Sequence, residues 1–87
     1  MIVAFLTNGW EDYLFWQATD KKMLQKVNSL IKECSRTPEH GSGNPEPLRG
    51  NLGGWWSRRI DQKHRLVYRV KGDILEITQC RYHYDDR

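Results

Sequence analysis

Hydrophobic and polar positions change their spacing along the chain, and this change separates a helical first half from a strand-rich second half. Residues 2–6 form a continuous run of apolar, β-forming residues, which predicts a short buried strand. Residues 8–18 follow helical spacing, and Asn8 with Glu11 resembles a capping box at the start of this first helix. A second helix is predicted from its N-cap Asp20 to about residue 34. Its apolar positions recur at intervals of three and four: Met23, Leu24, Val27, Leu30, Ile31 and Cys34.

The pattern changes again in the second half. Residues 35–54 hold all three prolines and five of the seven glycines, so they cannot form one helix or one regular central strand. Leu48 and Leu52 within this segment indicate a long loop that is pinned to the core. Three strands with short connecting loops, and therefore antiparallel neighbours, are predicted at 55–60, 64–70 and 73–82. The element order predicts an α+β fold, with two N-terminal helices packed on one face of a small, mainly antiparallel sheet. Residues 1–87 are expected to form a single domain.

The first predicted hairpin concentrates positive charge. A three-residue loop that pairs Ile60 with His64 would place Arg59 directly opposite Arg65 on one face of the sheet, whereas a register shifted by one residue would separate them. Between residues 49 and 65 there is one acid, Asp61, and five basic residues: Arg49, Arg58, Arg59, Lys63 and Arg65. Arginine is well shaped to hold phosphate through two parallel hydrogen bonds. The hairpin therefore predicts an anion-binding surface.

Composition narrows the function classes. Lys and Arg outnumber Asp and Glu by 14 to 11, which is compatible with an anionic partner. Cys34 and Cys80 have no companion at metal or redox spacing, so we expect reduced, buried thiols and no disulfide framework. His40, His64 and His83 lack ligand spacing with the cysteines, so no metal site is expected. The first residues match neither a signal peptide nor a membrane span, which predicts a cytoplasmic protein without membrane contact.

The loop and the end of the chain carry groups that could cleave RNA without a metal. Such cleavage requires a base for the ribose 2′-OH, an acid for the departing 5′-oxygen and cations for the phosphorane charge. Glu46 lies between two prolines that restrict its backbone, and His83 titrates near neutrality. Tyr82 or Tyr84 could stack on a base. Taken singly, the carboxylate could equally be a solvated charge and the histidine a surface residue.

Four spaced motifs point to a known family. They are Pro-Glu-Pro-Leu at 45–48, Trp-Ser-Arg-Arg-Ile at 56–60, His-Arg-Leu-Val-Tyr at 64–68 and Cys-Arg-Tyr-His-Tyr at 80–84. With these motifs residues 5–84 resemble the YoeB/Txe family of bacterial toxins in the RelE superfamily. The resemblance implies a microbial RNase-like fold and an endoribonuclease that needs no cofactor. Such an enzyme cleaves mRNA in the ribosomal A site and blocks translation. It also implies a YefM-like antitoxin that silences the toxin, with operator DNA bound only through the antitoxin complex, and it leaves a homodimer open.

The resemblance implies a role for each member of the site. Glu46 resembles the family's general base and His83 its general acid. Arg65, with Arg59, resembles the phosphate clamp, and Tyr84 resembles the tyrosine that helps to hold the substrate nucleotide. Three further residues are expected to bind RNA or phosphate: Arg49, Arg58 and Lys63.

Arg49 and the end of the chain depart from the family pattern. Arg49 stands where the family commonly has lysine, which keeps the charge and changes the hydrogen-bond geometry. The chain also continues beyond Tyr84 with a tail, residues 85–87, that begins with Asp85 and Asp86. Two carboxylates beside an RNA site would repel phosphate, so the tail would weaken activity, fold away or stay flexible.

Two other functions remain open at this point. The related ParE-like toxins resemble this fold but act by binding DNA gyrase. A basic module could also bind RNA without cutting it, using the arginines of the hairpin and the lysines on the outer face of the second helix. These lysines are Lys21, Lys22, Lys26 and Lys32.

Overall fold

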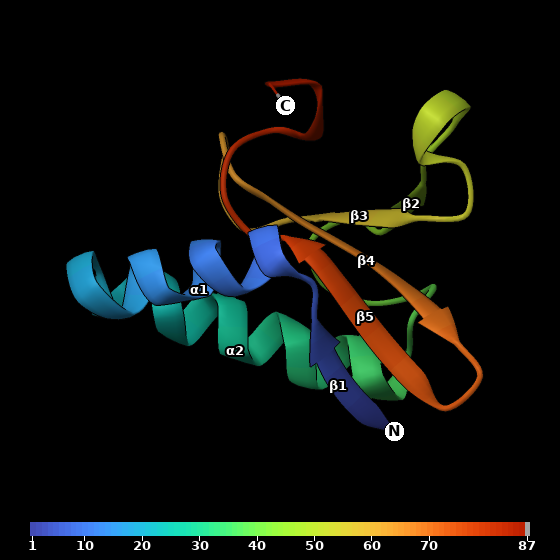
Figure 1. The fold of residues 1–87 in the computed structure, drawn as a ribbon, viewed down its shortest axis with the longest axis horizontal. Helices are drawn as coiled ribbons and strands as arrows, with labels where there is room; N and C mark the ends of the chain where they lie inside the picture. Colours follow the sequence, from blue (N-terminus) through green and yellow to red (C-terminus); the bar gives the residue numbers. More distant parts are fainter. Residues whose placement is uncertain (87) are drawn as a thin grey trace.

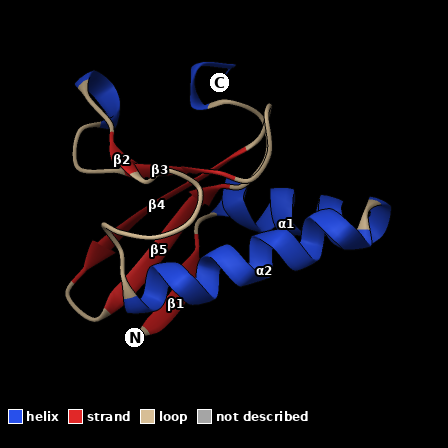
Figure 2. Cartoon of the chain, turned by 180° about the vertical axis from the view of Figure 1, so that it is seen from behind, coloured by secondary structure: helices blue, strands red, loops and turns tan. Residues whose placement is uncertain are grey.

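Two long helices cover one face of a five-stranded sheet in the computed structural model, which describes residues 1–86 (Figure 1). Seen from behind, α2 lies in front of the strands, with α1 beside it (Figure 2). The elements are β1 (Ile2–Phe5), α1 (Thr7–Thr19), α2 (Lys21–Arg36), β2 (Glu46–Pro47), β3 (Trp56–Arg59), β4 (Arg65–Lys71) and β5 (Ile74–Gln79), with 3-10 turns at Gly50–Leu52 and Tyr84–Asp86. The strand order is β1-β5-β4-β3-β2; β1 runs parallel to β5 and the other pairs are antiparallel. The predicted α+β fold is confirmed.

Helix α2 forms as its pattern predicted. The Asp20 carboxylate accepts a hydrogen bond from the Met23 N–H at 3.1 Å, which satisfies one of the donors that a helix start leaves open. The apolar face of α2 is buried against the sheet. Its buried residues are Met23, Val27, Leu30, Ile31 and Cys34, and they meet Leu66, Tyr68, Leu75 and Ile77 from β4 and β5. This cluster is the core that fixes the sheet on the helices.

Helix α1 begins differently from the prediction. Its N-cap is Leu6, without a side-chain cap, so the expected capping box at Asn8 is wrong. The Leu6 N–H donates to the Ile77 carbonyl at 2.8 Å, and the chain passes directly from β1 into the helix. Gly9 then faces β5 so closely that a Cβ there would lie 2.4 Å from the Ile77 carbonyl oxygen. Because β1 ends at Phe5 and the helix begins at Thr7, Leu6 occupies the N-cap position, and Asn8 already lies inside the helix.

Two strand predictions are corrected. Strand β1 is an edge strand, paired only with β5, and its Ile2 and Val3 are 62% and 42% exposed rather than buried. Strand β5 ends at Gln79 instead of continuing to residue 82. The Gln79 side chain donates to the carbonyls of Arg81 and Tyr82 at 2.8 and 3.1 Å, and these bonds turn the following segment out of the sheet. Residues 80–86 are therefore a separate C-terminal segment, which rises at the end of the sheet remote from the N-terminus (Figure 1).

The two thiols are free and buried, as predicted. Burial raises the pKa of Cys34 to about 11, which keeps the thiol protonated and unreactive. Within residues 1–86, none of the helices has the length and apolar character needed to cross a membrane.

Candidate active site

The hairpin of β3 and β4 presents two arginines opposite each other. Arg59 pairs with Arg65 in the observed register, as the three-residue loop predicted, and the Ile60 N–H donates to the His64 carbonyl at 2.9 Å. The Asp61 carboxylate closes the loop by accepting the N–H groups of Lys63 and His64 at 2.9 and 2.7 Å. Although burial alone would raise it, these backbone bonds hold the pKa of Asp61 below its usual value.

One nitrogen of Arg65 is fixed by this loop. Its Nη1 lies 2.9 Å from the Asp61 carbonyl, 3.3 Å from that of Gln62 and 3.1 Å from that of His64. Arg65 is half-buried, so its guanidinium is held at the base of the loop rather than extended into solvent. The guanidinium has five N–H donors, and those not bound to the loop remain for an anion.

Strand β2 brings Glu46 to the same face. Glu46 pairs with Ser57 of β3, and the Leu48 N–H donates to the Trp55 carbonyl at 2.9 Å. Leu48 is buried and pins the proline-rich loop, as expected, while Glu46 remains exposed. Because Arg59 lies two positions from Ser57 along β3, Glu46 and Arg59 project from the same side of the sheet.

The C-terminal segment completes the site. Tyr84, Glu46, Arg49 and Leu52 line a hollow of about 330 Å³ together with Asp85. The pKa of Tyr84 is raised by burial, then by the negative charges of Glu46 and Asp85 and by a hydrogen bond with Glu46, while the charge of Arg65 opposes the shift. Carboxylate, phenol and guanidinium are therefore close enough to interact.

The His83 ring lies against the Tyr84 ring beside this hollow, and the two aspartates that follow Tyr84 contact His83. Its ring centroid lies 4.1 Å from that of Tyr84. The Asp85 N–H donates to His83 Nδ1 at 3.2 Å, and the Asp85 carboxylate lies 3.6 Å from the same nitrogen. The His83 N–H donates to the Asp86 carboxylate at 3.3 Å, and the Asp86 N–H donates to the His83 carbonyl at 3.0 Å. Asp85 and Asp86 therefore do not fold away from the candidate site but contact His83. Residue 87 lies outside the described part of the chain.

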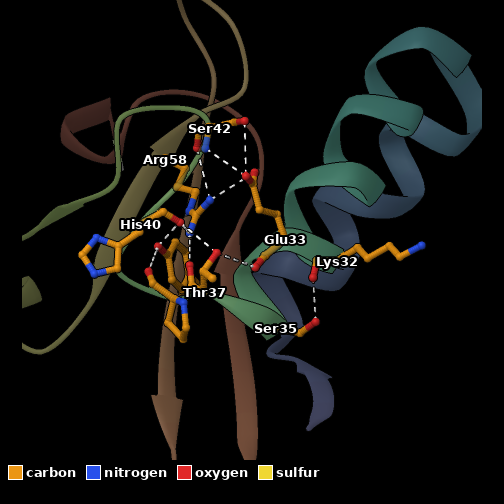
Figure 3. A network of polar contacts seen from close by, with 9 residues as sticks. Lys32, Glu33, Ser35, Thr37, His40, Ser42 and Arg58 are labelled. Atoms are coloured by element: carbon orange, nitrogen blue, oxygen red, sulfur yellow. Dashed lines mark hydrogen bonds and ion pairs between the residues drawn. The ribbon is translucent and has the colours of Figure 1, made fainter.

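Arg58 does not belong to this surface, which corrects the expectation that it binds phosphate. Its side chain is fully buried and points toward the helices (Figure 3). Nε donates to the Tyr68 hydroxyl at 3.0 Å, Nη1 lies 3.3 Å from the Glu33 carboxylate, and the guanidinium reaches three loop carbonyls, those of Thr37, His40 and Ser42. Trp56, Arg58 and Ile60 alternate with Ser57 and Arg59 along β3, so Arg58 faces inward. It anchors the loop after α2.

Arg49 and Lys63, which were also expected to bind phosphate, lie in different parts of the structure. Arg49 lines the hollow with Glu46 and Tyr84. The Lys63 ammonium instead lies 5.5 Å from the centre of the Tyr82 ring, at the tip of the hairpin. Arg59 borders a second hollow, beside α2, with lysines from that helix.

Sequence reasoning missed the residues that hold the C-terminal segment. The Trp16 indole N–H donates to the Cys80 carbonyl at 2.7 Å, and the Cys80 N–H donates to the Asp12 carboxylate at 3.1 Å. Both side chains are buried on α1. The Arg81 guanidinium lies 3.4 Å from the centre of the Phe15 ring. The available signal was that Asp12 lies three and four positions before Phe15 and Trp16, on one helical face, and an acid on a face that packs against the sheet needs a donor.

No three His, Cys, Asp or Glu side chains within residues 1–86 are grouped so that they could hold a metal ion. The groups that converge are a carboxylate, an imidazole, a phenol and guanidinium ions. This set can remove a proton, donate a proton and bind an anion.

Comparison with known proteins places the chain among bacterial toxins. Toxin YoeB of Escherichia coli K12 is 60% identical to the chain over 84 residues, which are 97% of this chain and all of the relative. Toxin YoeB of Streptomyces coelicolor is 51% identical over 84 residues, with the same coverage. The similarity therefore extends over nearly the whole chain.

Solved structures share the fold of this chain. A YoeB/ParE toxin from Agrobacterium tumefaciens superposes with a TM-score of 0.94 at 51% identity, over 97% of this chain and 100% of that one. A YoeB dimer from Staphylococcus aureus superposes with a TM-score of 0.89 at 44% identity, over 97% and 98% of the two chains. Residues 5–84 match the YoeB-like toxins, and the resemblance drawn from the four motifs is confirmed. The chain belongs to the family of YoeB-like toxins of bacterial type II toxin-antitoxin systems.

Proposed function

We propose that this toxin is an endoribonuclease that cleaves mRNA in the ribosomal A site and thereby blocks translation. The observation that carries the proposal is that Glu46 and Tyr84 meet at one surface hollow, where the charge of Arg65 acts on Tyr84 and the His83 ring lies against the Tyr84 ring. These groups come from β2, β4 and the C-terminal segment, so the fold itself assembles them.

Glu46 is the proposed general base. Its carboxylate is exposed at the edge of the hollow, and the backbone on both sides is restricted by proline. In this position it takes the proton from the ribose 2′-OH as the oxygen attacks the neighbouring phosphorus. The carboxylate is exposed, and hydrogen bonds and charges act most strongly where water is excluded, so we infer that the ribosome excludes water from the hollow during cleavage.

His83 is the proposed general acid. Its Nδ1 faces the Asp85 N–H, which leaves Nε2 as the nitrogen that can reach the departing 5′-oxygen. Transfer of a proton requires the imidazolium form, and in that form Nδ1 can no longer accept the Asp85 N–H. The tail contact therefore has to rearrange during each turnover.

The arginines and Tyr84 hold the substrate. Arg65 directs its unbound N–H groups to the phosphate and stabilises the charge that develops in the transition state, with Arg59 opposite and Arg49 at the rim. The Tyr84 ring packs against the nucleotide. None of these steps needs a metal ion.

Control of this activity requires a partner. A YoeB-YefM toxin-antitoxin complex from Staphylococcus aureus is heterotetrameric, and a YoeB from the same organism forms a dimer. We propose that this chain likewise binds a YefM-like antitoxin and can self-associate, and that it meets operator DNA only through the antitoxin complex. Because translation supplies the substrate, the site of action is the cytoplasm.

Primer extension on a defined message in a reconstituted translation system tests the proposal. We expect breaks within codons that require ribosomes, and about 10²- to 10⁴-fold slower cleavage by Glu46→Ala and His83→Ala. Glu39→Ala and His40→Ala are the matched controls, because these residues are exposed and lie away from the hollow.

Four results would contradict the proposal. Breaks without ribosomes would remove the ribosome dependence, and unchanged rates in both site variants would remove the assignment of base and acid. A block of translation without any breaks would leave a binding function, and inhibition of DNA supercoiling would select the ParE-like alternative.

A further inference from the structure

The peptide just before His83 is fastened to the β3–β4 hairpin. Tyr82 has a φ of 66°, in the left-handed region that residues other than glycine seldom adopt. Its N–H donates to His64 Nδ1 at 2.8 Å, and its carbonyl accepts the Arg65 N–H at 3.0 Å and the Gln79 amide at 3.1 Å. Hydrogen bonds at both the N–H and the carbonyl of Tyr82 thus hold its unusual backbone conformation.

The His64 ring is also held in place by an aromatic contact with helix α1. Its ring meets the Trp16 indole edge-on, with centroids 4.8 Å apart and planes at 80°. The same indole donates to the Cys80 carbonyl at 2.7 Å. Helix α1, the hairpin and the C-terminal segment therefore meet at one imidazole, which accepts a hydrogen bond from the segment.

The hydrogen bond requires a neutral imidazole with its proton on Nε2, because Nδ1 is the acceptor. Burial lowers the pKa of His64 and favours this form. The charged groups around the ring act in both directions. Asp61 from the loop and Asp12 from α1 favour the imidazolium, whereas Lys63 from the loop and Arg81 from the C-terminal segment oppose it.

We propose that His64 is a positioning residue for the toxin's cleavage reaction: by accepting the Tyr82 N–H it sets the direction in which His83 and Tyr84 leave the sheet. This inference rests on the proposed function. His64 lies on the hairpin and contacts the turn, not the RNA. Its loss lets the Tyr82 backbone relax to the common conformations, and because His83 is the next residue, the imidazole moves away from the leaving oxygen. Misplacement by about 1 Å can cost on the order of 10²-fold in rate.

Two isosteric substitutions separate this role from simple packing. The Oδ1 of asparagine can occupy the place of His64 Nδ1 and accept the same N–H, whereas the longer glutamine side chain places its terminus near Nε2. Both changes remove the ring from Trp16, so His64→Asn and His64→Gln are matched for the loss of that contact. Urea unfolding of both variants confirms that they are folded and compares their stabilities.

Single-turnover cleavage on saturating ribosomes is the first measurement. We expect His64→Gln to cleave at least about 10-fold more slowly at an unchanged half-saturating ribosome concentration, and His64→Asn to stay within about threefold of the parent. Equal slowing of both variants would reduce His64 to a packing residue and overturn the proposal. A parental rate in His64→Gln would overturn it as well.

A second measurement does not depend on cleavage. Histidine ring ¹⁵N shifts in the parent are expected to show His64 as the neutral Nε2–H form at pH 7, and a protonated Nδ1 would overturn the proposal. If the parent cut no RNA, the proposed function would fail, while the ring shifts would still decide whether the hydrogen bond exists.

Discussion

Neighbouring arginines on β3 are expected to respond to substitution in opposite ways. Arg58 is fully buried and binds the Tyr68 hydroxyl, three loop carbonyls and Glu33 (Figure 3). Arg59 is exposed and lies opposite another arginine. We predict that Arg58→Ala unfolds easily but keeps its site chemistry when folded, and that Arg59→Ala keeps its stability and cleaves more slowly.

The magnitude for Arg58 follows from its partners. A hydrogen bond to a charged group contributes about 1.5–3 kcal/mol, and breaking a buried ion pair costs about 3–5 kcal/mol. These terms overlap, because the loop that contains the carbonyls can turn toward water after the guanidinium is gone. A loss of about 3–5 kcal/mol is therefore expected, which is a large part of the roughly 5–15 kcal/mol that stabilises a domain. Arg59→Ala should change stability by no more than about 0.5 kcal/mol.

Urea unfolding followed by tryptophan fluorescence measures both variants under identical conditions. Arg58→Lys is the informative third variant, because it keeps the charge and loses the planar fork, and its stability should fall between those of the parent and Arg58→Ala. A loss below about 1 kcal/mol in Arg58→Ala, or equal losses at positions 58 and 59, would refute the inward orientation of Arg58.

Three further predictions concern the tail, the helix–sheet contact and pH. The double change Asp85→Asn, Asp86→Asn should speed cleavage up to about 10-fold at low salt, because each carboxylate about 6 Å from a phosphate costs about 0.7 kcal/mol in water; unchanged rates in a salt series would contradict this. Gly9→Ala should destabilise by more than about 2 kcal/mol, because its Cβ would lie 2.4 Å from a β5 carbonyl oxygen, and a parental urea midpoint would argue against that packing. The free energy of unfolding should decrease as the pH falls below about 6.5, because burial lowers the pKa of His64 in the folded chain. In this range the unfolded chain binds a proton at His64 that the folded chain does not. The decrease ends when the pH falls below the pKa of His64 in the folded chain. His64→Asn should flatten this dependence in pH-resolved urea titrations.

Much of the site was predictable because it depends on local rules. The three-residue loop and strand pairing place Arg59 opposite Arg65. The apolar spacing of α2 and its Asp20 cap likewise predict a helix that the structure contains. Each of these features needs only neighbours within about ten residues. Strand β2 at Glu46 was not predicted, because the prolines and glycines of residues 35–54 indicated only an irregular loop.

The errors arise where distant parts of the chain decide the outcome. The alternation of Trp56, Arg58 and Ile60 could have shown that Arg58 faces the core. A buried arginine is expected, however, only where its hydrogen-bond acceptors are known. The carbonyls that bind Arg58 lie about 20 residues away, in the loop after α2. A continuous apolar run suggests a strand buried on both faces, yet β1 lies at the edge of a sheet covered by helices on one side. The exit of the last strand is set by side chains of α1 and by His64, which no local pattern near residue 80 reveals.

The role of His83 as the acid is the central chemical claim, and a sulfur substitution tests it most directly. A message with sulfur in place of the bridging 5′-oxygen at the cleaved bond has a leaving group that departs without a proton. On this message, bound to ribosomes, His83→Ala should cleave at nearly the parental rate, whereas Glu46→Ala should remain about 10²- to 10⁴-fold slow because the 2′-OH still needs a base. If His83→Ala were as slow on the sulfur message as on the natural one, His83 would not be the group that protonates the leaving oxygen.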